Sequence, residues 1–364
     1  MDSAPINLTG FGKILHIESN TIYKWYRDVL SDYAKDGGQS VHENDITIKD
    51  KSIEKTIRVP IFREENIGSK MAIDEKQIGE DIYTIMSNRE TGKIAMVCQS
   101  LKFNEINQVL QKHKNALSVV KSFTRDFSLL YRKVGNEIFP KALQVIDKFH
   151  IIKNLMEAHQ DIRVKYRQKE LDKRRKAYKE FKEKEKQRLQ ECELTGKKFK
   201  AKKFYYKEQR HENRETTLEL LARSRYLLYK FKSQWTKKQE NRAKILFKLF
   251  PEIEKSYDLT CQFRDFMSKK NIGKHYLQIT KQLYQWYDDV EDAQIDEMLN
   301  FKTLIEINEQ QILNYFNEGE TNAMAEAINR KIQKFISSNQ GTRDRDFFFF
   351  RLNLYFALAH QNII

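Results

Sequence analysis

The fold is decided by the stretch Lys70-Met-Ala-Ile-Asp-Glu75, an apolar run that reads as a short strand ending in carboxylates. Two later stretches also carry a lone carboxylate, Val119-Val-Lys-Ser-Phe-Thr-Arg-Asp126 and the helical run Thr321-Asn-Ala-Met-Ala-Glu-Ala-Ile-Asn-Arg330. A pair of divalent cations that clamps a phosphodiester needs acidic oxygen ligands brought together from separate elements. Asp74, Asp126 and Glu326 are therefore the candidate ligands of a phosphoryl-transfer site.

The segment around the first two acids alternates short apolar strands with helices. Three strands are predicted over 71–74, 81–87 and 93–98, the last two joined by a hairpin-like turn with Gly92 at its end. The elements predicted after them are a helix over 104–113, a buried strand over 117–123, a helix over 127–139, a strand over 142–146 and a helix from Lys148 onward. The order is three strands, helix, strand, helix, strand, helix.

The composition favours a polyanionic partner. Lys and Arg number 66 against 51 Asp and Glu, and the formal charge is +15 at pH 7. Such an excess favours binding to nucleic acid or to an anionic membrane. No apolar stretch approaches the roughly 20 residues that span a bilayer, and the N-terminus lacks the layout of a signal peptide. We therefore expect nucleic acid as the partner, and no membrane.

Length and cysteine content narrow the class further. A chain of 364 residues exceeds the usual single domain, so we expect two or three domains. Cys98, Cys192 and Cys261 are scattered and lack CxxC spacing, which excludes a readable disulfide framework or zinc ribbon. The expected compartment is a reducing cytoplasm.

The first 35 residues resemble a helix-turn-helix segment. Residues 11–30 predict a short helix, a turn and a second helix capped by Ser19 or Asn20. Lys24 and Arg27 on the second helix are candidates for phosphate contacts. The alternative is two amphipathic helices that pack on another part of the chain. Residues 36–68 are polar and are interpreted as a linker with one strand over 56–61.

The section from about 150 to 318 predicts helices and no strand. Residues 163–214 are strongly basic, which is typical of a solvated helix or of a surface laid along a phosphate backbone. Pro251 separates two later helices, and Trp235 and Trp286 are expected in the helical core. The basic residues proposed to contact DNA are Arg163, Lys165, Arg174, Arg175, Lys197, Lys198, Lys202 and Lys203.

Strand order and carboxylate placement agree with an α/β architecture, an RNase H-like mixed sheet. There the first acid lies on the first strand, the second just after the fourth strand, and the third on a later helix. Further motifs resemble the DDE transposases of the ISL-three insertion-sequence family, whose fifth strand ends in a similar Asp-Arg-Phe-His. The matching stretches are Gln144-Val-Ile-Asp-Lys-Phe-His150, Ile138-Phe-Pro-Lys-Ala142, Met324-Ala-Glu-Ala-Ile-Asn-Arg-Lys-Ile332, and Gly341 with Arg343 and Phe347.

The resemblance covers about residues 65–364 and implies a metal-dependent recombinase. Such an enzyme nicks double-stranded DNA at transposon ends and joins the free 3′ hydroxyl to target DNA. The resemblance also implies a catalytic domain in two parts, 69–155 and 319–364, interrupted by a large all-α insertion over 156–318. Asp74, Asp126 and Glu326 are then catalytic residues that hold two Mg²⁺, for which Mn²⁺ can substitute.

The same resemblance implies a partner and a location. Transposition needs two DNA ends held together, so a homodimer or a larger synaptic assembly is expected. The location is the cytoplasm of a prokaryote, at the nucleoid. Arg343 joins the candidate DNA contacts. Members of the family usually begin with a cysteine-based zinc motif ahead of the helix-turn-helix, and this sequence shows no such cysteines. We therefore expect a separate small protein to supply recognition of the ends.

Each acid has an ordinary alternative. Asp74 can be a solvated strand end, Asp126 can cap the helix that begins at residue 127, and Glu326 can be a solvated helix residue. Asp147 fits the pattern of the second acid as well as Asp126 does, and Asp126 is preferred because it ends the strand next to the first. Asp147 and His150 are then neighbours of the site, where a hydrogen bond between them can cap the helix.

Two other functional classes stay open from the sequence. One is a transposase-derived protein that binds DNA without cutting it, which nicking assays separate from the enzyme. The other is a helical scaffold, suggested by the long charged helices. Strict heptads are not sustained there, and a scaffold leaves the strand-rich block from 70 to 146 unexplained.

Overall fold

The computed structural model describes residues 8–50, 53–318, 323–338 and 344–358. The chain divides into two compact units, one made of residues 1–150 with 310–364 and the other of residues 151–309. The second unit overlaps the insertion expected at 156–318.

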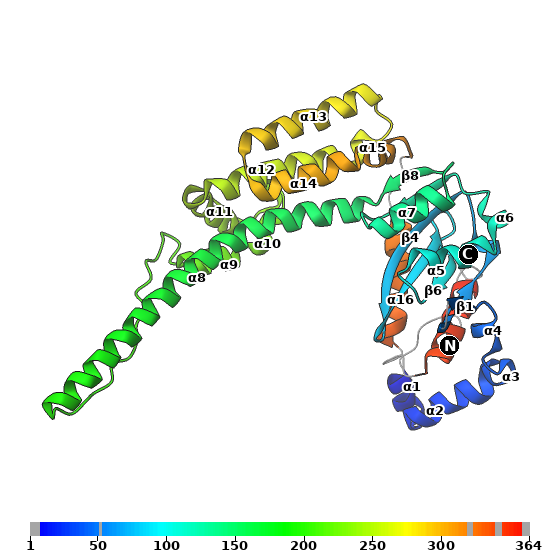
Figure 1. Ribbon diagram of the computed structural model, residues 1–364, viewed down its shortest axis with the longest axis horizontal. Helices are drawn as coiled ribbons and strands as arrows, with labels where there is room; N and C mark the ends of the chain where they lie inside the picture. The colour runs from blue at the N-terminus through cyan, green and yellow to red at the C-terminus, as the bar shows by residue number, and fades with distance from the viewer. Residues whose placement is uncertain (1–7, 51–52, 319–322, 339–343, 359–364) are drawn as a thin grey trace. The chain divides into compact units, whose positions relative to one another are not determined.

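A mixed sheet lies at the centre of the first unit (Figure 1). Its order is β3-β6-β5-β4-β7-β8. Strands β4, β5 and β6 pair antiparallel, whereas β7 runs parallel to both β4 and β8. The strands are β3 Ile61–Phe62, β4 Lys70–Ile78, β5 Asp81–Asn88, β6 Ile94–Cys98, β7 Ser122–Arg125 and β8 Leu143–Ile146. The predicted mixed sheet is confirmed, and the structure shows that its last two strands pair in parallel.

Alternation along the strands buries both faces of this sheet. Met71 and Ile73 of β4 belong to a core that includes residues of α5 Phe103–Gln111 and α7 Leu129–Ile138. Ile78 of the same strand belongs to a second core, which contains residues of α16 Ala323–Ser338 and α17 Arg345–Leu358. Since side chains alternate along a strand, β4, β5 and β6 contribute to both cores.

One predicted strand begins later than expected. Residues 117–123 were predicted as a strand, but Leu117 closes the short helix α6 Lys114–Leu117 and the strand starts at Ser122. Val119 is exposed while Leu117 and Val120 are buried, so the apolar run is a turn held against the core. The strand starts where it can pair with β4, at the level of Lys70.

The prediction of a linker over 36–68 is wrong. This stretch contains α4 Gln39–His42, the antiparallel hairpin β1 Ile46–Asp50 and β2 Ile53–Ile57, and the edge strand β3. The stretch is folded because its few apolar side chains are packed in the core, and Val41, Ile57 and Val59 are almost fully buried. Charged residues are numerous around these apolar ones, and their number hides the core pattern in the sequence.

The predicted helix, turn and helix at the N-terminus are present as α1 Leu8–Leu15, α2 Ser19–Trp25 and a π-helical turn Tyr26–Leu30, followed by α3 Tyr33–Asp36. α2, the π-helical turn and α3 pack on α17. Phe347 lies with its ring centroid 5.7 Å from those of Tyr23 and Tyr26 and 5.0 Å from that of Tyr33. The second helix thus packs on another part of the chain, as the alternative interpretation predicts, while contact of the exposed Lys24 with DNA stays a prediction.

The second unit is built from helices (Figure 1). Trp286 is fully buried against Phe263 and Phe301, and the Trp235 indole donates to the Leu227 carbonyl oxygen at 2.8 Å. Both tryptophans thus have the structural role expected of them. The helices are α8 Lys148–Thr195, which begins in the first unit, α9 Thr217–Arg223, α10 Arg225–Leu228, α11 Lys237–Leu249, α12 Pro251–Phe266, α13 Tyr276–Ala293 and α14 Asp296–Ile307. α15 Glu309–Glu318 leads back to the first unit.

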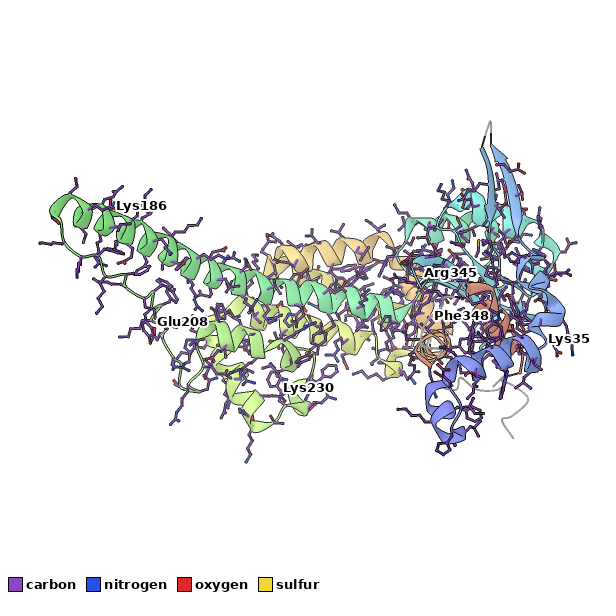
Figure 2. All side chains as sticks on the ribbon, turned by 90° about the horizontal axis from the view of Figure 1, so that it is seen from below. Lys35, Lys186, Glu208, Lys230, Arg345 and Phe348 are labelled. Carbon is purple, nitrogen blue, oxygen red and sulfur yellow. The ribbon has the colours of Figure 1, made fainter. Side chains whose placement is uncertain are left out.

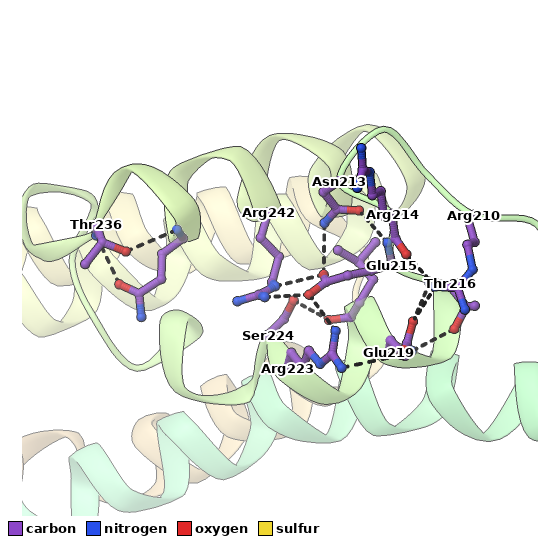
Figure 3. A network of polar contacts seen from close by, with 12 residues as sticks. Arg210, Asn213, Arg214, Glu215, Thr216, Glu219, Arg223, Ser224, Thr236 and Arg242 are labelled. Atoms are coloured by element: carbon purple, nitrogen blue, oxygen red, sulfur yellow. Dashed lines mark hydrogen bonds and ion pairs between the residues drawn. The ribbon is translucent and has the colours of Figure 1, made fainter.

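A buried carboxylate ties three segments of this unit together (Figure 3). Glu215 accepts from Arg242 of α11, at 2.9 Å from Nε and 2.5 Å from Nη2, and from Arg223 of α9 at 3.1 Å. Hydrogen bonds from Arg242 hold the pKa of Glu215 at about 2, so it stays charged at neutral pH. The ion pairs fix the start of α9, where Thr216 and Glu219 form a capping box.

Replacement of Phe347 tests the contact between α17 and the N-terminal helices. Phe347→Ala removes a ring that is 2% exposed, so we expect the free energy of unfolding to fall by about 3–5 kcal/mol in denaturant titrations. Val29→Ala, at a side chain that is 71% exposed, is the control and should cost about 0.5 kcal/mol or less. Equal losses in the two variants would contradict the packing described above.

Candidate active site

The register of two parallel strands brings the first two candidate acids together. Ala72 of β4 pairs with Thr124 of β7. Two residues after each of these lie Asp74, in the middle of β4, and Asp126, just past the end of β7, so both acids reach the same level on adjacent strands. Because side chains repeat every two residues, Asp74 lies on the same face of β4 as Ala72.

The next strand adds a third acid to this row. Arg125 of β7 is opposite Ile146 of β8. One residue later come Asp126 and Asp147, the latter held by a hydrogen bond from its backbone N–H to the Arg125 carbonyl oxygen at 2.8 Å. Three acids thus lie at one level across neighbouring parallel strands, Asp74 within β4, Asp126 just after β7 and Asp147 just after β8, and we call this set the aspartate row.

Helix α16 covers the face on which Asp74 lies. Ile78 occupies that face four residues after Asp74, and it packs in one core with Ile332 and Phe335 of α16. The helix also contacts β4. Glu326 belongs to α16, and its side chain lies outside the described part of the structure. The third candidate acid is therefore carried by the element that packs over the aspartate row's first strand.

His150 lies between two members of the row. Its Nε2 is 3.8 Å from Asp74 Oδ1 and 3.9 Å from Asp147 Oδ2. The predicted hydrogen bond between Asp147 and His150 is not made by this atom pair, since 3.9 Å is too long. The helix start is capped instead by Asp147 Oδ1, which accepts the backbone N–H of Phe149 at 2.9 Å. His150 is thus placed to balance the charge of two carboxylates.

Asp126 has a similar local role. Its Oδ1 accepts the backbone N–H of Ser128 at 2.8 Å, immediately before α7. Helix α7 begins at Leu129 with Ser128 as its N-cap, so Asp126 does not cap it as the ordinary alternative proposed, and the hydrogen bond to Ser128 instead closes a turn just before the helix. It engages Oδ1 and holds the carboxylate in one orientation, which is compatible with a second role for the group.

Burial and like charge make the row electrostatically unfavourable. Burial raises the pKa of Asp126 above its usual value, and the charge of Asp74 adds to this, while the Ser128 N–H and the charges of His150 and Arg125 oppose it. Burial also raises the pKa of Glu75, with Asp126 and Asp74 adding to the effect. A cation placed among these groups would relieve their repulsion.

Glu75 was not among the candidate residues, although it directly follows Asp74 in the sequence. Tyr131 of α7 hydrogen-bonds to its carboxylate and lowers its pKa in part. Since Glu75 alternates with Asp74, the usual strand rule assigns it to the opposite face. Only the structure points to Glu75, through its electrostatic interaction with Asp126.

The donor set suits a hard divalent cation, since carboxylate oxygens are the ligands that Mg²⁺ prefers. Among the side chains that the structure describes, no three His, Cys, Asp or Glu groups are close enough to form a metal-binding cluster. That search does not extend to the side chain of Glu326.

One predicted DNA contact must be corrected. Arg163 is only 7% exposed, and its guanidinium donates to the Leu221 carbonyl oxygen at 2.9 Å and to Gln160 at 2.8 Å. A side chain locked in this way supports the helical core and is not available to a phosphate. Lys165 is also engaged, because its ammonium lies 3.2 Å from Glu297 and 3.5 Å from Glu252.

The other basic candidates lie at the surface. Arg174 and Arg175 are more than half exposed, although they pair with Glu208 at 3.7 Å and Asp172 at 3.0 Å. Arg27 pairs with Asp28 at 2.7 Å and Asp344 at 3.0 Å. Lys24, Lys197, Lys198, Lys202 and Lys203 are exposed, and Arg343 lies outside the described residues. No helix of the described chain has the length and apolarity needed to cross a bilayer.

Comparison with known families gives one match. The model of a transposase family, the DDE type of the ISL-three group, matches residues 71–352. The matched range contains the whole aspartate row, the helical unit and α16. No curated protein and no solved structure gives a significant match.

Neutralising one acid tests the repulsion within the row. The folded protein holds the Asp126 proton more tightly than the unfolded chain does, so this group lowers stability as pH rises from about 4 through its folded pKa. Asp126→Asn keeps an oxygen acceptor for the Ser128 N–H. We therefore expect the variant to raise Tm by a few degrees at pH 7 in metal-free buffer, and the gain to vanish near pH 4.

Differential scanning fluorimetry over this pH range measures the effect, with Asp161→Asn as an exposed control in α8. Mg²⁺ should raise the Tm of the native chain but have little effect on Asp126→Asn. A lower Tm for Asp126→Asn at pH 7 would show that the acid stabilises the metal-free fold.

Proposed function

Because the chain belongs to the ISL-three family of DDE transposases, we propose that it cuts DNA strands at transposon ends and transfers the free 3′ hydroxyls to target DNA. The family establishes a transposase of a mobile element that acts on DNA. The proposal adds the chemistry, the residues that carry it and a site of action in the cytoplasm, at the nucleoid.

The observation that carries the proposal is the adjacency of Asp74 and Asp126, which lie at one level of two neighbouring parallel strands, Asp74 within β4 and Asp126 just past β7. This topology supports an RNase H-like relationship for the sheet. Helix α16 packs against the strand that bears Asp74, so Glu326 can complete an acidic site from a third element. Acids from two strands and a helix, far apart in sequence, are the ligand arrangement that phosphodiester cleavage requires.

In this proposal Asp74, Asp126 and Glu326 hold two Mg²⁺, with Mn²⁺ as a substitute. The ions supply activation of a water or hydroxyl nucleophile and stabilisation of the leaving oxygen. The Ser128 N–H fixes the orientation of the Asp126 carboxylate. The His150 imidazole lies beside the carboxylates of Asp74 and Asp147.

Asp126 is preferred over Asp147 as the second ligand on positional grounds. β7 is the direct neighbour of β4, whereas β8 is one strand further away. Asp147 is also the more enclosed of the two, with 7% of its surface exposed. Its role in the proposal is to support the helix start at Phe149 and to face His150.

A DNA-binding protein that no longer cuts is the alternative. The exposed lysines Lys197, Lys198, Lys202 and Lys203 are the observation in its favour, because they suit DNA binding whether or not strands are cut. Both alternatives share double-stranded DNA as partner and an assembly of two or more copies at paired DNA ends. Strand cleavage separates them.

A nicking assay tests the proposal directly. The purified chain is incubated with supercoiled plasmid that carries the terminal repeats of its element, in Mg²⁺, in Mn²⁺ or with a chelator. We expect cleavage only with metal, and a loss of at least about 100-fold in rate for Asp74→Asn and for Glu326→Gln, since each removes a metal-binding charge. Asp126→Asn should lose more activity than Asp147→Asn.

Glu80→Gln is the matched control, because Glu80 is an exposed carboxylate in the turn between β4 and β5. It should cleave at the native rate. Cleavage by Asp74→Asn at that same rate would rule out the proposed site, and metal-independent cleavage by the native chain would rule out the proposed chemistry.

A further inference from the structure

The far half of α8 and the segment that returns along it form a basic arm, which we define as residues 170–208 (Figures 1 and 2). Figure 2 labels Lys186 on the helix and Glu208 on the returning segment. The returning segment has no regular secondary structure from residue 197 to 208. Contacts with α8 hold it in place, including a hydrogen bond from the Lys202 backbone N–H to Glu185 at 2.9 Å.

Aromatic rings anchor the returning segment on α8. Phe204 packs against Tyr178 and Phe181, with ring centroids 5.0 Å and 5.3 Å apart. The ring of Tyr206 stacks on Phe204 at 6.4 Å with an interplanar angle of 24°. Arg188 lies over Phe199, nearer the tip. These contacts account for the rings that face the helix.

Tyr205 faces the other way. Exposure alternates strictly from residue 203 to 208, with Phe204, Tyr206 and Glu208 partly buried and the residues between them exposed. Tyr205 is 84% exposed, more than any other aromatic side chain described in the structure. The alternation puts Lys203 and Lys207, two residues away on either side, on the same exposed side as the Tyr205 ring.

The charge around this ring is positive. The returning segment from 196 to 207 contains the lysines Lys197, Lys198, Lys200, Lys202, Lys203 and Lys207 and no acidic residue. All of these lysines are exposed. Lysines along an extended segment match the spaced negative charges of a phosphate backbone, so the surface complements a nucleic acid strand.

We propose that the returning segment binds DNA and that Tyr205 stacks on an unpaired base while the lysines on either side hold the strand's phosphates. This inference rests on the proposed function, because it takes DNA as the substrate. An exposed ring between lysines offers an aromatic face for a base and positive charges for the phosphates. Proteins that bind single-stranded nucleic acids use the same combination. Paired bases are stacked on each other and offer no free face, so the ring selects bases that are unpaired or turned out of the duplex.

The Tyr205 hydroxyl offers a competing mode of DNA binding, in which it donates a hydrogen bond to a phosphate of paired DNA. The two modes respond differently to substitution. Tyr205→Phe keeps the ring and loses the hydroxyl, whereas Tyr205→Ala loses both. Stacking therefore predicts that Tyr205→Phe behaves like the native chain.

Fluorescence anisotropy with the full chain tests the proposal. Two probes of equal length are compared at fixed salt, a fully paired duplex and the same duplex with three unpaired bases at its centre. We expect the native chain and Tyr205→Phe to prefer the probe with unpaired bases by about tenfold in Kd. Tyr205→Ala should bind both probes with the affinity that the native chain has for the paired duplex.

Tyr226→Ala is the matched control, because Tyr226 is 71% exposed in the same unit but lies outside the arm. It should keep the native preference. Circular dichroism checks that each variant is folded. The proposal would be overturned if Tyr205→Ala kept the native preference, or if the native chain showed no preference. Loss of binding to both probes in Tyr205→Phe would instead assign the residue to a phosphate contact.

The test is independent of cleavage. Glu80→Gln should bind both probes as the native chain does, since this exposed carboxylate lies in the other unit and outside the proposed site. If the native chain never cuts DNA yet shows the Tyr205-dependent preference, the arm proposal stands and the proposed chemistry fails. If it cuts DNA without that preference, the arm proposal fails alone.

Discussion

The parallel pairing of β4 with β7 is the constraint on which the candidate site depends. Antiparallel pairing about the same Ala72 and Thr124 contact would carry Asp126 away from Asp74. With β7 parallel and Ala72 level with Thr124, both acids lie at one level of the sheet, and β8 brings Asp147 to the same level. The core on one face holds these strands against α5 and α7, while α16 and α17 hold the other face. The N-terminal helices in turn pack on α17 through Phe347.

The repulsion among these carboxylates lowers the stability of the first unit, and packing elsewhere in the unit offsets this loss. Asp126 and Glu75 are partly buried beside Asp74, and their raised pKa values express the repulsion. A carboxylate cluster that destabilises the metal-free fold but accepts a cation well is a common trade-off between stability and function. The sheet tolerates this because both of its faces are covered by apolar side chains.

Much of this arrangement is predictable from the sequence, and particular residues show why the rest is not. The strand order and the acids are readable because each strand is a short apolar run ended by a turn or a carboxylate. The hairpin over 46–57 escaped prediction because its burial depends on a few residues, such as Ile57, among many charged ones. Arg163 looked like a DNA contact, and only the fold reveals Leu221 as its acceptor. In both cases the deciding partner is distant in sequence.

The most direct measurement of the central claim is anomalous diffraction from crystals of the chain soaked in Mn²⁺. The account predicts anomalous density beside the carboxylates of Asp74 and Asp126, with Glu326 of α16 reaching the same density. Density shared by Asp74 and Asp147 without Asp126 would reassign the second ligand. Mn²⁺ density away from Asp74, with none at the aspartate row, would contradict the account.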